Sequence, residues 1–370
     1  MHLLFVLYSL RGGGAERVTS ILANHWASEG HEITLVTFTG TTDDFYELDP
    51  EIRRIRINLT SLSTGPIAAI GFNLERILAL RKLLLTEQPD VAISMMSTAN
   101  VLLAIASLGL RRLIKLGSER IHPPELPLGR TWSFLRWFSY GFLDAIVAQT
   151  KLSAVWIRSH TLSRRVVVIE NPLSPFFSNR PPLVSPAELV MPHERLLLAV
   201  GRLDYQKGFD LLLEAFSTIA AAHPSWKLVI LGEGKDRHLL ECMRLKAGLE
   251  HRVALPGWAG NISEWYHRAN LFVLSSRFEG FPNVLAEAMA AGLPVVSTNC
   301  PTGPGDLVID GVSGLLVPVN DPVGLAQVLD TLMADDMARQ ALATEARRLS
   351  ARLELGSIAT NWERLFSKAV

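Results

Sequence analysis

The chain has 370 residues, of which 48% are hydrophobic and 19% charged, a composition typical of a folded protein of two or three domains. Its 36 basic residues balance its 36 acidic ones, which argues against a nucleic-acid partner, because contacts along a polyanion need a surplus of lysine and arginine. Two cysteines, Cys242 and Cys300, exclude a disulfide framework and a cysteine-rich zinc site, and indicate a reducing compartment.

Two apolar stretches in the first third of the chain are interpreted as buried strands and helices rather than as a signal peptide or a membrane span. Residues 3–10 predict a buried strand rather than a signal peptide, since no lysine or arginine precedes them. Residues 91–110 carry no formal charge over a length that could span a bilayer, but Ser94, Ser97 and Asn100 interrupt them. We therefore expect a strand at residues 91–96 followed by a buried helix.

Short strands rich in valine, isoleucine and leucine alternate with helical stretches along the whole chain. Strands are expected at residues 3–10, 32–38, 52–57, 91–96, 114–117, 145–148 and 166–169, and again at 196–201, 227–232, 253–256, 271–275, 294–297 and 315–318. This alternation is typical of parallel sheets covered by helices on both faces. A proline-rich stretch at residues 171–192 separates the two series. The sequence thus predicts an α/β protein of two doubly wound domains, residues 1–172 and 173–352, with ligands at the carboxyl ends of the strands and the active site in the cleft between the domains.

A glycine-rich loop follows the first strand. Residues 11–17 read Arg-Gly-Gly-Gly-Ala-Glu-Arg and open a helix. Glycines let the backbone approach a ligand closely, and a helix N-terminus favours anions. The loop lacks the dinucleotide fingerprint and the P-loop pattern. Taken alone, it fits a tight turn as well as a binding loop.

Two loops in the second half carry charged side chains just after strands. Residues 201–208 hold Arg202 and Lys207, two cations suited to a diphosphate; the alternative is a pair of solvated surface cations. Residues 275–288 hold Glu279 on a loop and Glu287 inside the following helix, among apolar residues. A buried carboxylate needs partners, and ligand hydroxyls would serve; the alternative is two surface acids at a helix start.

The start of that helix is a second candidate for anion binding. Pro282 suits the first helical position, where its missing N–H costs nothing. The backbone N–H groups of Asn283, Val284 and Leu285 would then be free to bind phosphate oxygens.

These segments together resemble glycosyltransferase family 4. The spacing from Glu279 to Glu287, within Ser-Ser-Arg-x-Glu-Gly-x-Pro-Asn, is similar to the E-x7-E signature of retaining glycosyltransferases, and residues 12–17 and 201–208 also resemble the family. The resemblance covers nearly the whole chain. It implies the GT-B fold, two Rossmann-like domains facing across a cleft, with residues 353–370 forming a helix that crosses back to the N-terminal, acceptor-binding domain.

The resemblance also implies roles for individual residues. Arg202 and Lys207 would bind the donor diphosphate and stabilise the leaving nucleotide. Glu279 would face the hydroxyls of the donor sugar, completing the catalytic set, and Glu287 would bind the ribose. The remaining donor-binding positions are Gly13, Gly14, Phe281, Asn283, Val284 and Leu285. A histidine that many members place against the donor sugar aligns with Arg120, and His122 follows two residues later, so both are candidates for that contact.

The implied activity is retaining hexosyl transfer in cell-surface polysaccharide or glycoconjugate synthesis. We expect a UDP-hexose or UDP-N-acetylhexosamine as donor and a glycan or polyprenyl-diphosphate-linked glycan as acceptor. We expect no metal and no cofactor, because Arg202 and Lys207 supply the positive charge and no Asp-x-Asp motif adjoins them. The resemblance assigns neither glutamate as a nucleophile, which favours departure and attack on one face of the sugar. The alternatives are a nucleotide-sugar 2-epimerase and a non-catalytic sugar-nucleotide-binding protein.

The charge is unevenly distributed along the chain. Residues 51–165 contain 16 basic and 7 acidic residues, among them Arg53, Arg54 and Arg56. Aromatic residues surround Arg136, a combination typical of a helix lying on an anionic membrane; the alternative is a helix whose aromatics fill the core. We therefore expect a cytoplasmic protein with peripheral contact at the inner face of the membrane.

Overall fold

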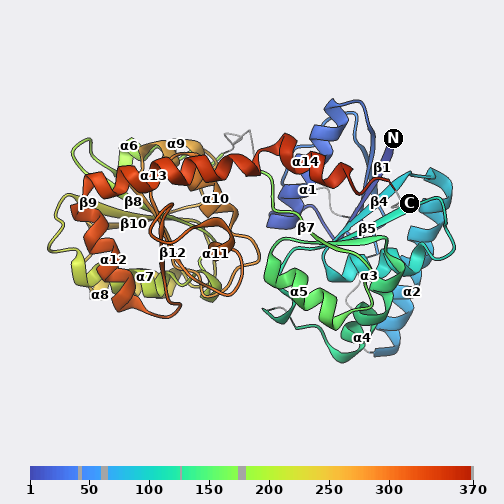
Figure 1. The fold of residues 1–370 in the computed structure, drawn as a ribbon. Coiled ribbons are helices and arrows are strands. Elements are labelled where there is room, and N and C mark those ends of the chain that lie inside the picture. Colours follow the sequence, from blue (N-terminus) through green and yellow to red (C-terminus); the bar gives the residue numbers. More distant parts are fainter. Residues whose placement is uncertain (41–43, 60–65, 126, 174–180, 368–370) are drawn as a thin grey trace. The chain divides into compact units, whose positions relative to one another are not determined.

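The chain folds into two compact α/β units. A computed structural model describes residues 1–40, 44–59, 66–125, 127–173 and 181–367, without the side chains of residues 66–70. Unit 1 comprises Met1–Pro172 and Leu355–Val370, and unit 2 comprises Leu173–Glu354 (Figure 1).

Unit 1 is built on a parallel sheet in the order β3-β2-β1-β4-β5-β6-β7. Its strands are β1 (His2–Leu7), β2 (Glu32–Thr37), β3 (Arg53–Arg56), β4 (Val91–Met95), β5 (Ile114–Glu119), β6 (Ala145–Ala148) and β7 (Val166–Val168). Its helices are α1 (Gly14–Ser28), α2 (Pro66–Glu87), α3 (Ser97–Ala106), α4 (Arg130–Ser139), α5 (Lys151–His160) and α14 (Leu355–Glu363), with short turns η1 (Pro123–Glu125) and η2 (Tyr140–Phe142). The strand order reverses between β1 and β4, as in doubly wound folds.

Unit 2 repeats this plan in the order β10-β9-β8-β11-β12-β13, again all parallel. Its strands are β8 (Arg195–Val200), β9 (Trp226–Leu231), β10 (Val253–Gly257), β11 (Leu271–Leu274), β12 (Val295–Thr298) and β13 (Leu315–Val317). Its helices are α6 (Pro186–Leu189), α7 (Phe209–Ile219), α8 (Arg237–Lys246), α9 (Ile262–Arg268), α10 (Asn283–Ala290), α11 (Pro304–Leu307), α12 (Pro322–Ala334) and α13 (Asp336–Ser350), with turns η3 (Tyr205–Lys207) and η4 (Ala351–Leu353).

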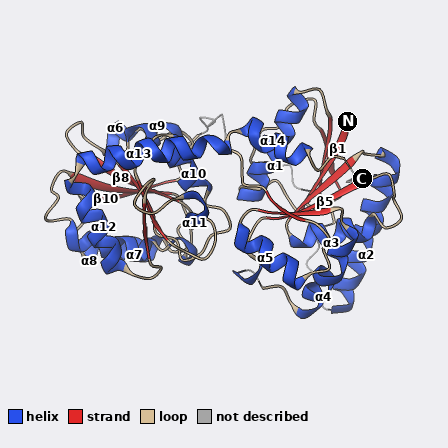
Figure 2. Ribbon diagram, in the orientation of Figure 1, coloured by secondary structure: helices blue, strands red, loops and turns tan. Residues whose placement is uncertain are grey.

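Helices cover both faces of each sheet, which is why most strands are apolar; the edge strand β3, with Arg53, Arg54 and Arg56, is an exception (Figure 2). In unit 1, α1 and α14 pack on one face. The indole of Trp26 donates a hydrogen bond to Oε1 of Glu363 at 2.8 Å and its ring lies 5.2 Å from Phe366. The end of the chain is therefore a structural part of unit 1.

The predicted fold class, two doubly wound α/β domains, is confirmed. The uncharged stretch at residues 91–110 forms β4 and α3, both largely buried, as expected. Across the described ranges, no helix combines the length and the apolar character needed to span a bilayer. The sequence pattern indicated no helix at residues 186–189, 304–307 or 336–350, where the structure has α6, α11 and α13.

Candidate active site

The loops after β8 and β11 converge where the strand order of unit 2 reverses. In open α/β sheets this reversal creates a crevice at the carboxyl ends of the strands, where ligands bind. The loop after β8 carries Arg202 and Lys207, and the loop after β11 carries Glu279. Two motifs separated by 72 residues in sequence are thereby joined by a direct hydrogen bond.

Lys207 and Glu279 form a buried ion pair. The ammonium of Lys207 donates to Oε1 of Glu279 at 2.6 Å, and Oγ of Ser276 donates to the same oxygen at 2.6 Å. Only 14% of the lysine side chain and 5% of the glutamate side chain are exposed. A carboxylate at this depth needs both partners, and it in turn fixes the direction of the ammonium.

Tight backbone packing holds the two loops together. The amide of Gln206 donates to the carbonyl of Phe278 at 3.0 Å, and the hydroxyl of Ser275 donates to the carbonyl of Lys207 at 2.9 Å. Gly208 has φ of +61°, and a Cβ on it would lie 2.2 Å from the carbonyl oxygen of Ser275. Glycine is therefore required here by both conformation and space.

Arg202 differs from Lys207 in its exposure. Its side chain is 72% exposed, and its guanidinium lies 3.2 Å from a carboxylate oxygen of Asp204 and 3.2 Å from the amide oxygen of Gln206. A surface ion pair of this kind contributes little, so an incoming anion can displace it. The two predicted cations thus occur as one fixed, buried group and one adaptable, exposed group.

Glu287 lies inside α10 and is buried. Its Oε2 accepts a hydrogen bond at 2.9 Å from the hydroxyl of Tyr266, which is itself buried on α9. The interpretation of Glu287 as a surface acid is therefore wrong. Tyr266 was not predicted, because it lies on a separate helix and no spacing links it to Glu287.

The start of α10 differs from the expectation. Pro282 caps the helix instead of occupying its first position, which is Asn283. The backbone N–H of Asn283 donates to the carbonyl of Phe281 at 3.0 Å, and that of Leu285 donates to the carbonyl of Pro282 at 3.0 Å. The prediction of three free N–H groups is therefore wrong, because the turn around Pro282 uses two of them. That of Val284 has no acceptor among the residues that the structure describes.

In unit 1 the glycine loop leads from β1 into α1. Gly13 caps the helix in an extended conformation and Gly14 is its first residue. The hydroxyl of Tyr46 donates to the carbonyl of Gly13 at 3.0 Å. In the first turn, burial raises the pKa of Glu16, while the positive charge of Arg120 acts in the opposite direction.

Arg120 lies just after β5, at the carboxyl edge of the same sheet, and is buried. Its guanidinium donates to Oδ1 of Asn171 at 2.5 Å, and Gln149 donates to that oxygen at 2.7 Å. Burial lowers the pKa of Arg120 to about 9, and the charge of Glu16 opposes this. Within the described part of the chain, Nε of Arg120 and Oε1 of Gln149 have no hydrogen-bond partner. Such buried orphan groups are suited to a polar ligand.

His122 occupies a different position. It is buried, and its Nδ1 lies 3.1 Å from the hydroxyl of Ser153 at the start of α5. Burial lowers its pKa, while the charge of Glu125 acts in the opposite direction. His122 thus already has a partner within unit 1.

The arginines of β3 form ion pairs inside unit 1. Arg53 lies 2.7 Å from Glu87, and Arg54 and Arg56 lie 3.0 Å and 2.8 Å from the same carboxylate, Asp44. Three arginines share two carboxylates and the Arg53 side chain is 60% exposed, so a membrane contact of this run stays a prediction. The partners were not predictable, because they lie outside the run in sequence.

Solved structures share this two-domain architecture. HepE from Anabaena, in complex with UDP and glucose, matches with a TM-score of 0.79 over 100% of both chains at 20% identity. Sucrose-phosphate synthase from Thermosynechococcus elongatus matches with a TM-score of 0.79 over 99% of this chain and 98% of the other, at 19% identity. The two parallel sheets with their loops at the strand-order reversals thus define a GT-B protein with two Rossmann-like domains.

Sequence similarity identifies the family. A family model described as "Glycosyltransferase Family 4" matches residues 12–175, and one described as "Glycosyl transferases group 1" matches residues 186–349. A relative from Campylobacter jejuni is 30% identical over 369 residues, covering 100% of this chain and 99% of its own; it is named GalNAc-alpha-(1->4)-GalNAc-alpha-(1->3)-diNAcBac-PP-undecaprenol alpha-1,4-N-acetyl-D-galactosaminyltransferase. The amylovoran biosynthesis glycosyltransferase AmsD from Erwinia amylovora is 27% identical, with 92% of both chains covered. This chain belongs to glycosyltransferase family 4 and is a glycosyltransferase.

Proposed function

We propose that the chain is a retaining, metal-independent glycosyltransferase that uses a UDP-hexose or UDP-N-acetylhexosamine to extend a lipid-linked glycan in cell-surface polysaccharide or glycoconjugate synthesis. The observation that carries this proposal is the buried pair of Lys207 and Glu279 beside the exposed Arg202. The names of the relatives support it: one Campylobacter relative acts on an undecaprenol-linked glycan, and the Anabaena neighbour was solved with UDP.

The proposed donor site is formed by residues of unit 2. Arg202 and Lys207 bind the diphosphate, and the N–H of Val284 adds a donor at the start of α10. Glu287, held by Tyr266, accepts hydrogen bonds from the ribose hydroxyls. Phe281 is buried beside this turn and closes the apolar side of the site. Lys207, Arg202 and the N–H of Val284 would together stabilise the charge that develops on the leaving diphosphate.

Retention is proposed to occur on one face of the sugar. The bond between the anomeric carbon and the phosphate oxygen breaks, and the acceptor hydroxyl bonds to that carbon on the same face. Its proton passes to the departing phosphate oxygen. A double displacement needs a carboxylate nucleophile, but Glu279 is bonded to Lys207 and Ser276, and Glu287 is bonded to Tyr266. Both are therefore assigned to binding and positioning.

Unit 1 is proposed to bind the acceptor and to contact the donor sugar. Gly13 and Gly14 give the backbone close access to both substrates. Of the two candidates for the sugar contact we favour Arg120, because its Nε has no hydrogen-bond partner among the described residues, whereas Nδ1 of His122 lies 3.1 Å from the hydroxyl of Ser153. A lipid-linked acceptor would place the enzyme in peripheral contact with an anionic membrane.

The first experiment is a thermal-shift panel with UDP, GDP, ADP, CMP and the common UDP-sugars, in the presence of EDTA. A ligand that binds only the folded state raises the melting temperature according to its concentration over Kd. Selective stabilisation by UDP and one UDP-sugar is expected. That donor is then incubated with a polyprenyl-diphosphate-linked glycan, and NMR of the product should show the donor's α configuration retained.

The other results of this experiment are equally informative. Stabilisation by GDP alone would replace the proposed donor. Conversion of the donor without acceptor would indicate the epimerase. A nucleotide sugar that binds but is never turned over would indicate a non-catalytic binding protein. Transfer that stops in EDTA and returns with magnesium would contradict metal independence.

A further inference from the structure

Helix α4 turns large aromatic side chains toward solvent. Phe134 is 59% exposed, Trp137 42% and Phe138 45%. Their rings form one cluster, with centroid separations of 5.6 Å between Phe134 and Trp137 and 6.5 Å between Phe134 and Phe138. Arg136 points the other way: it is buried, 4.6 Å above the ring of Trp156. Arg136 is therefore buried while three of the four aromatic residues of α4 are exposed; Trp132 packs on the core and Arg130 is exposed at the start of the helix. Clustered exposed rings are unusual for a helix that contacts only water.

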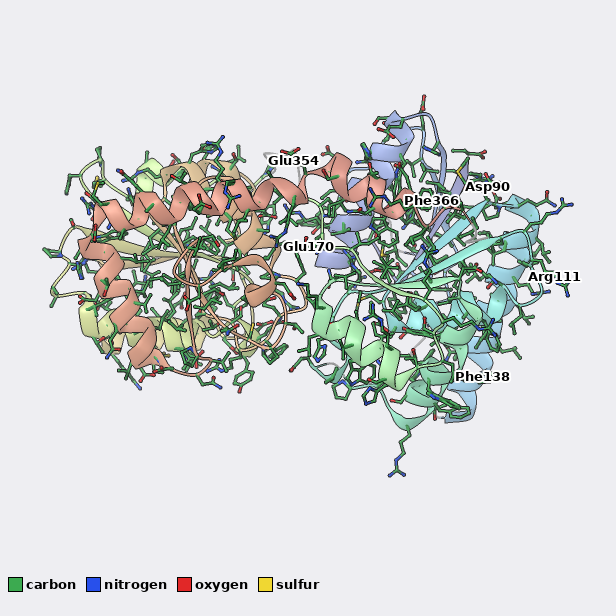
Figure 3. All side chains as sticks on the ribbon, viewed as in Figure 1. Asp90, Arg111, Phe138, Glu170, Glu354 and Phe366 are labelled. Carbon is green, nitrogen blue, oxygen red and sulfur yellow. The ribbon has the colours of Figure 1, made fainter. Side chains whose placement is uncertain are left out.

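This aromatic face continues into a basic depression. The ring of Phe138 lies 5.0 Å from that of Phe142, and Phe142 lines a depression of about 460 Å³. The depression lies at the amino ends of β5, β6 and β7, at the edge of the sheet opposite Arg120. Its charged and large apolar lining residues are Leu108, Leu110, Arg111, Lys115, Phe142, Leu143, Asp144 and Arg164. Figure 3 labels Phe138 on α4 and Arg111, both at the surface of unit 1.

The charges around this surface are mostly positive. The lining of the depression holds three basic residues, Arg111, Lys115 and Arg164, and one acidic residue, Asp144. In the depression, Asp144 is 3.9 Å from Lys115, whereas Arg164 is exposed and has no partner among the described residues. A surplus of cations therefore adjoins the exposed aromatic rings.

We propose that the depression binds the phosphate of an anionic phospholipid while Phe134, Trp137 and Phe138 enter the interfacial layer of the same bilayer. Aromatic rings prefer that layer, and each nearby lysine or arginine adds attraction to anionic lipid. Contact with a second copy of the chain is disfavoured, because it would bring two basic depressions together. This inference rests on the proposed lipid-linked acceptor, and it gives the membrane contact a defined surface.

The test is flotation of the full chain with vesicles of phosphatidylcholine alone or with 30% phosphatidylglycerol, at low and high salt. Wild type should bind the anionic vesicles, and binding should weaken with salt. Arg111→Gln/Arg164→Gln should lower the partition coefficient roughly 30-fold, from two lost basic contacts. Phe134→Ser/Trp137→Ser/Phe138→Ser should lower it at least as much, on neutral and anionic vesicles alike. The matched control, Lys246→Gln/Arg347→Gln, removes two exposed cations of unit 2 and should leave binding unchanged.

Several results would overturn the inference. These are equal binding of wild type to both kinds of vesicle, loss of binding in the control alone, and loss of a dimer rather than of vesicle binding in the aromatic variant. Binding of soluble glycerol phosphate in the depression, without any binding to vesicles, would make the depression a site for a soluble anion. Transfer to a detergent-dispersed acceptor is measured in parallel. If that transfer proceeds while vesicles are not bound, the docking surface is wrong and the proposed function stands; if no variant or wild type transfers sugar, the proposed function fails on its own.

Discussion

The pair of Lys207 and Glu279 allows structural and catalytic contributions to be separated. Lys207→Met leaves a buried carboxylate that still accepts a hydrogen bond from the hydroxyl of Ser276, and Glu279→Gln leaves a lysine that is 14% exposed without its counterion. Breaking one partner of a buried pair costs about 3–5 kcal/mol. Because Lys207 retains some access to solvent, we expect about 3 kcal/mol, which lowers the melting temperature of unit 2 by roughly 6–12 °C.

The double variant is the decisive one. It removes both charges together, so most of the lost stability should return. Activity should not return, because the fixed ammonium is absent; each single and the double variant should lose about 10²–10³ in kcat. The assay measures melting temperature, kcat and KM for the donor at saturating acceptor.

A matched control is the pair of Arg54 and Asp44 in unit 1, which lie 3.0 Å apart with 11% and 18% of their side chains exposed. Arg54→Met should lower stability and leave kcat within about twofold of wild type. Recovery of activity together with stability in the Lys207/Glu279 double variant would refute the catalytic assignment. A near-normal kcat in the single variant Lys207→Met would also refute the catalytic assignment.

Three further outcomes are expected. Gly208→Ala should lower stability by about 1–3 kcal/mol more than Gly248→Ala. Both glycines have positive φ, but only at Gly208 would the added Cβ meet a backbone oxygen. Equal melting temperatures of the two variants would contradict this. Tyr266→Phe should raise KM for the donor roughly tenfold with little change in kcat, because it removes one hydrogen bond to the buried carboxylate of Glu287. Isothermal titration with UDP measures the affinity directly, and an unchanged affinity would count against the assignment of Glu287 to the ribose. Burial lowers the pKa of His122 from 6.5, so the unfolded chain binds its proton more tightly and stability falls as the pH drops below about 6.5; melting curves of His122→Gln should lack this part of the fall.

The sequence pattern predicted those parts of the fold and the site that depend on residues close together in sequence. Strand–helix alternation predicted two doubly wound sheets, because buried parallel strands must be apolar on both faces. The loops carrying Arg202, Lys207 and Glu279 were found because charged and glycine residues directly follow apolar strands. Their meeting follows from topology, since neighbouring parallel strands end at one edge of the sheet.

The sequence pattern could not predict contacts between side chains on elements that are distant in sequence. Tyr266 reaches Glu287 from another helix, and Asp44 reaches Arg54 and Arg56 from outside β3. For α4 the composition was ambiguous, because aromatic and basic residues alternate over a single helix. The packing of Arg136 onto Trp156 decides which face is buried, and that contact depends on α5.

The two proposed interactions are carried by different units, and this makes them experimentally separable. The pair of Lys207 and Glu279 belongs to unit 2, whereas the aromatic face of α4 and its depression belong to unit 1. Within unit 1 the depression also lies at the sheet edge opposite Arg120, so its loss leaves the sugar-contacting edge intact. Rates on dispersed acceptor should therefore respond to the ion pair alone. Only on vesicles should the rate depend on α4, and that dependence should grow with the fraction of anionic lipid.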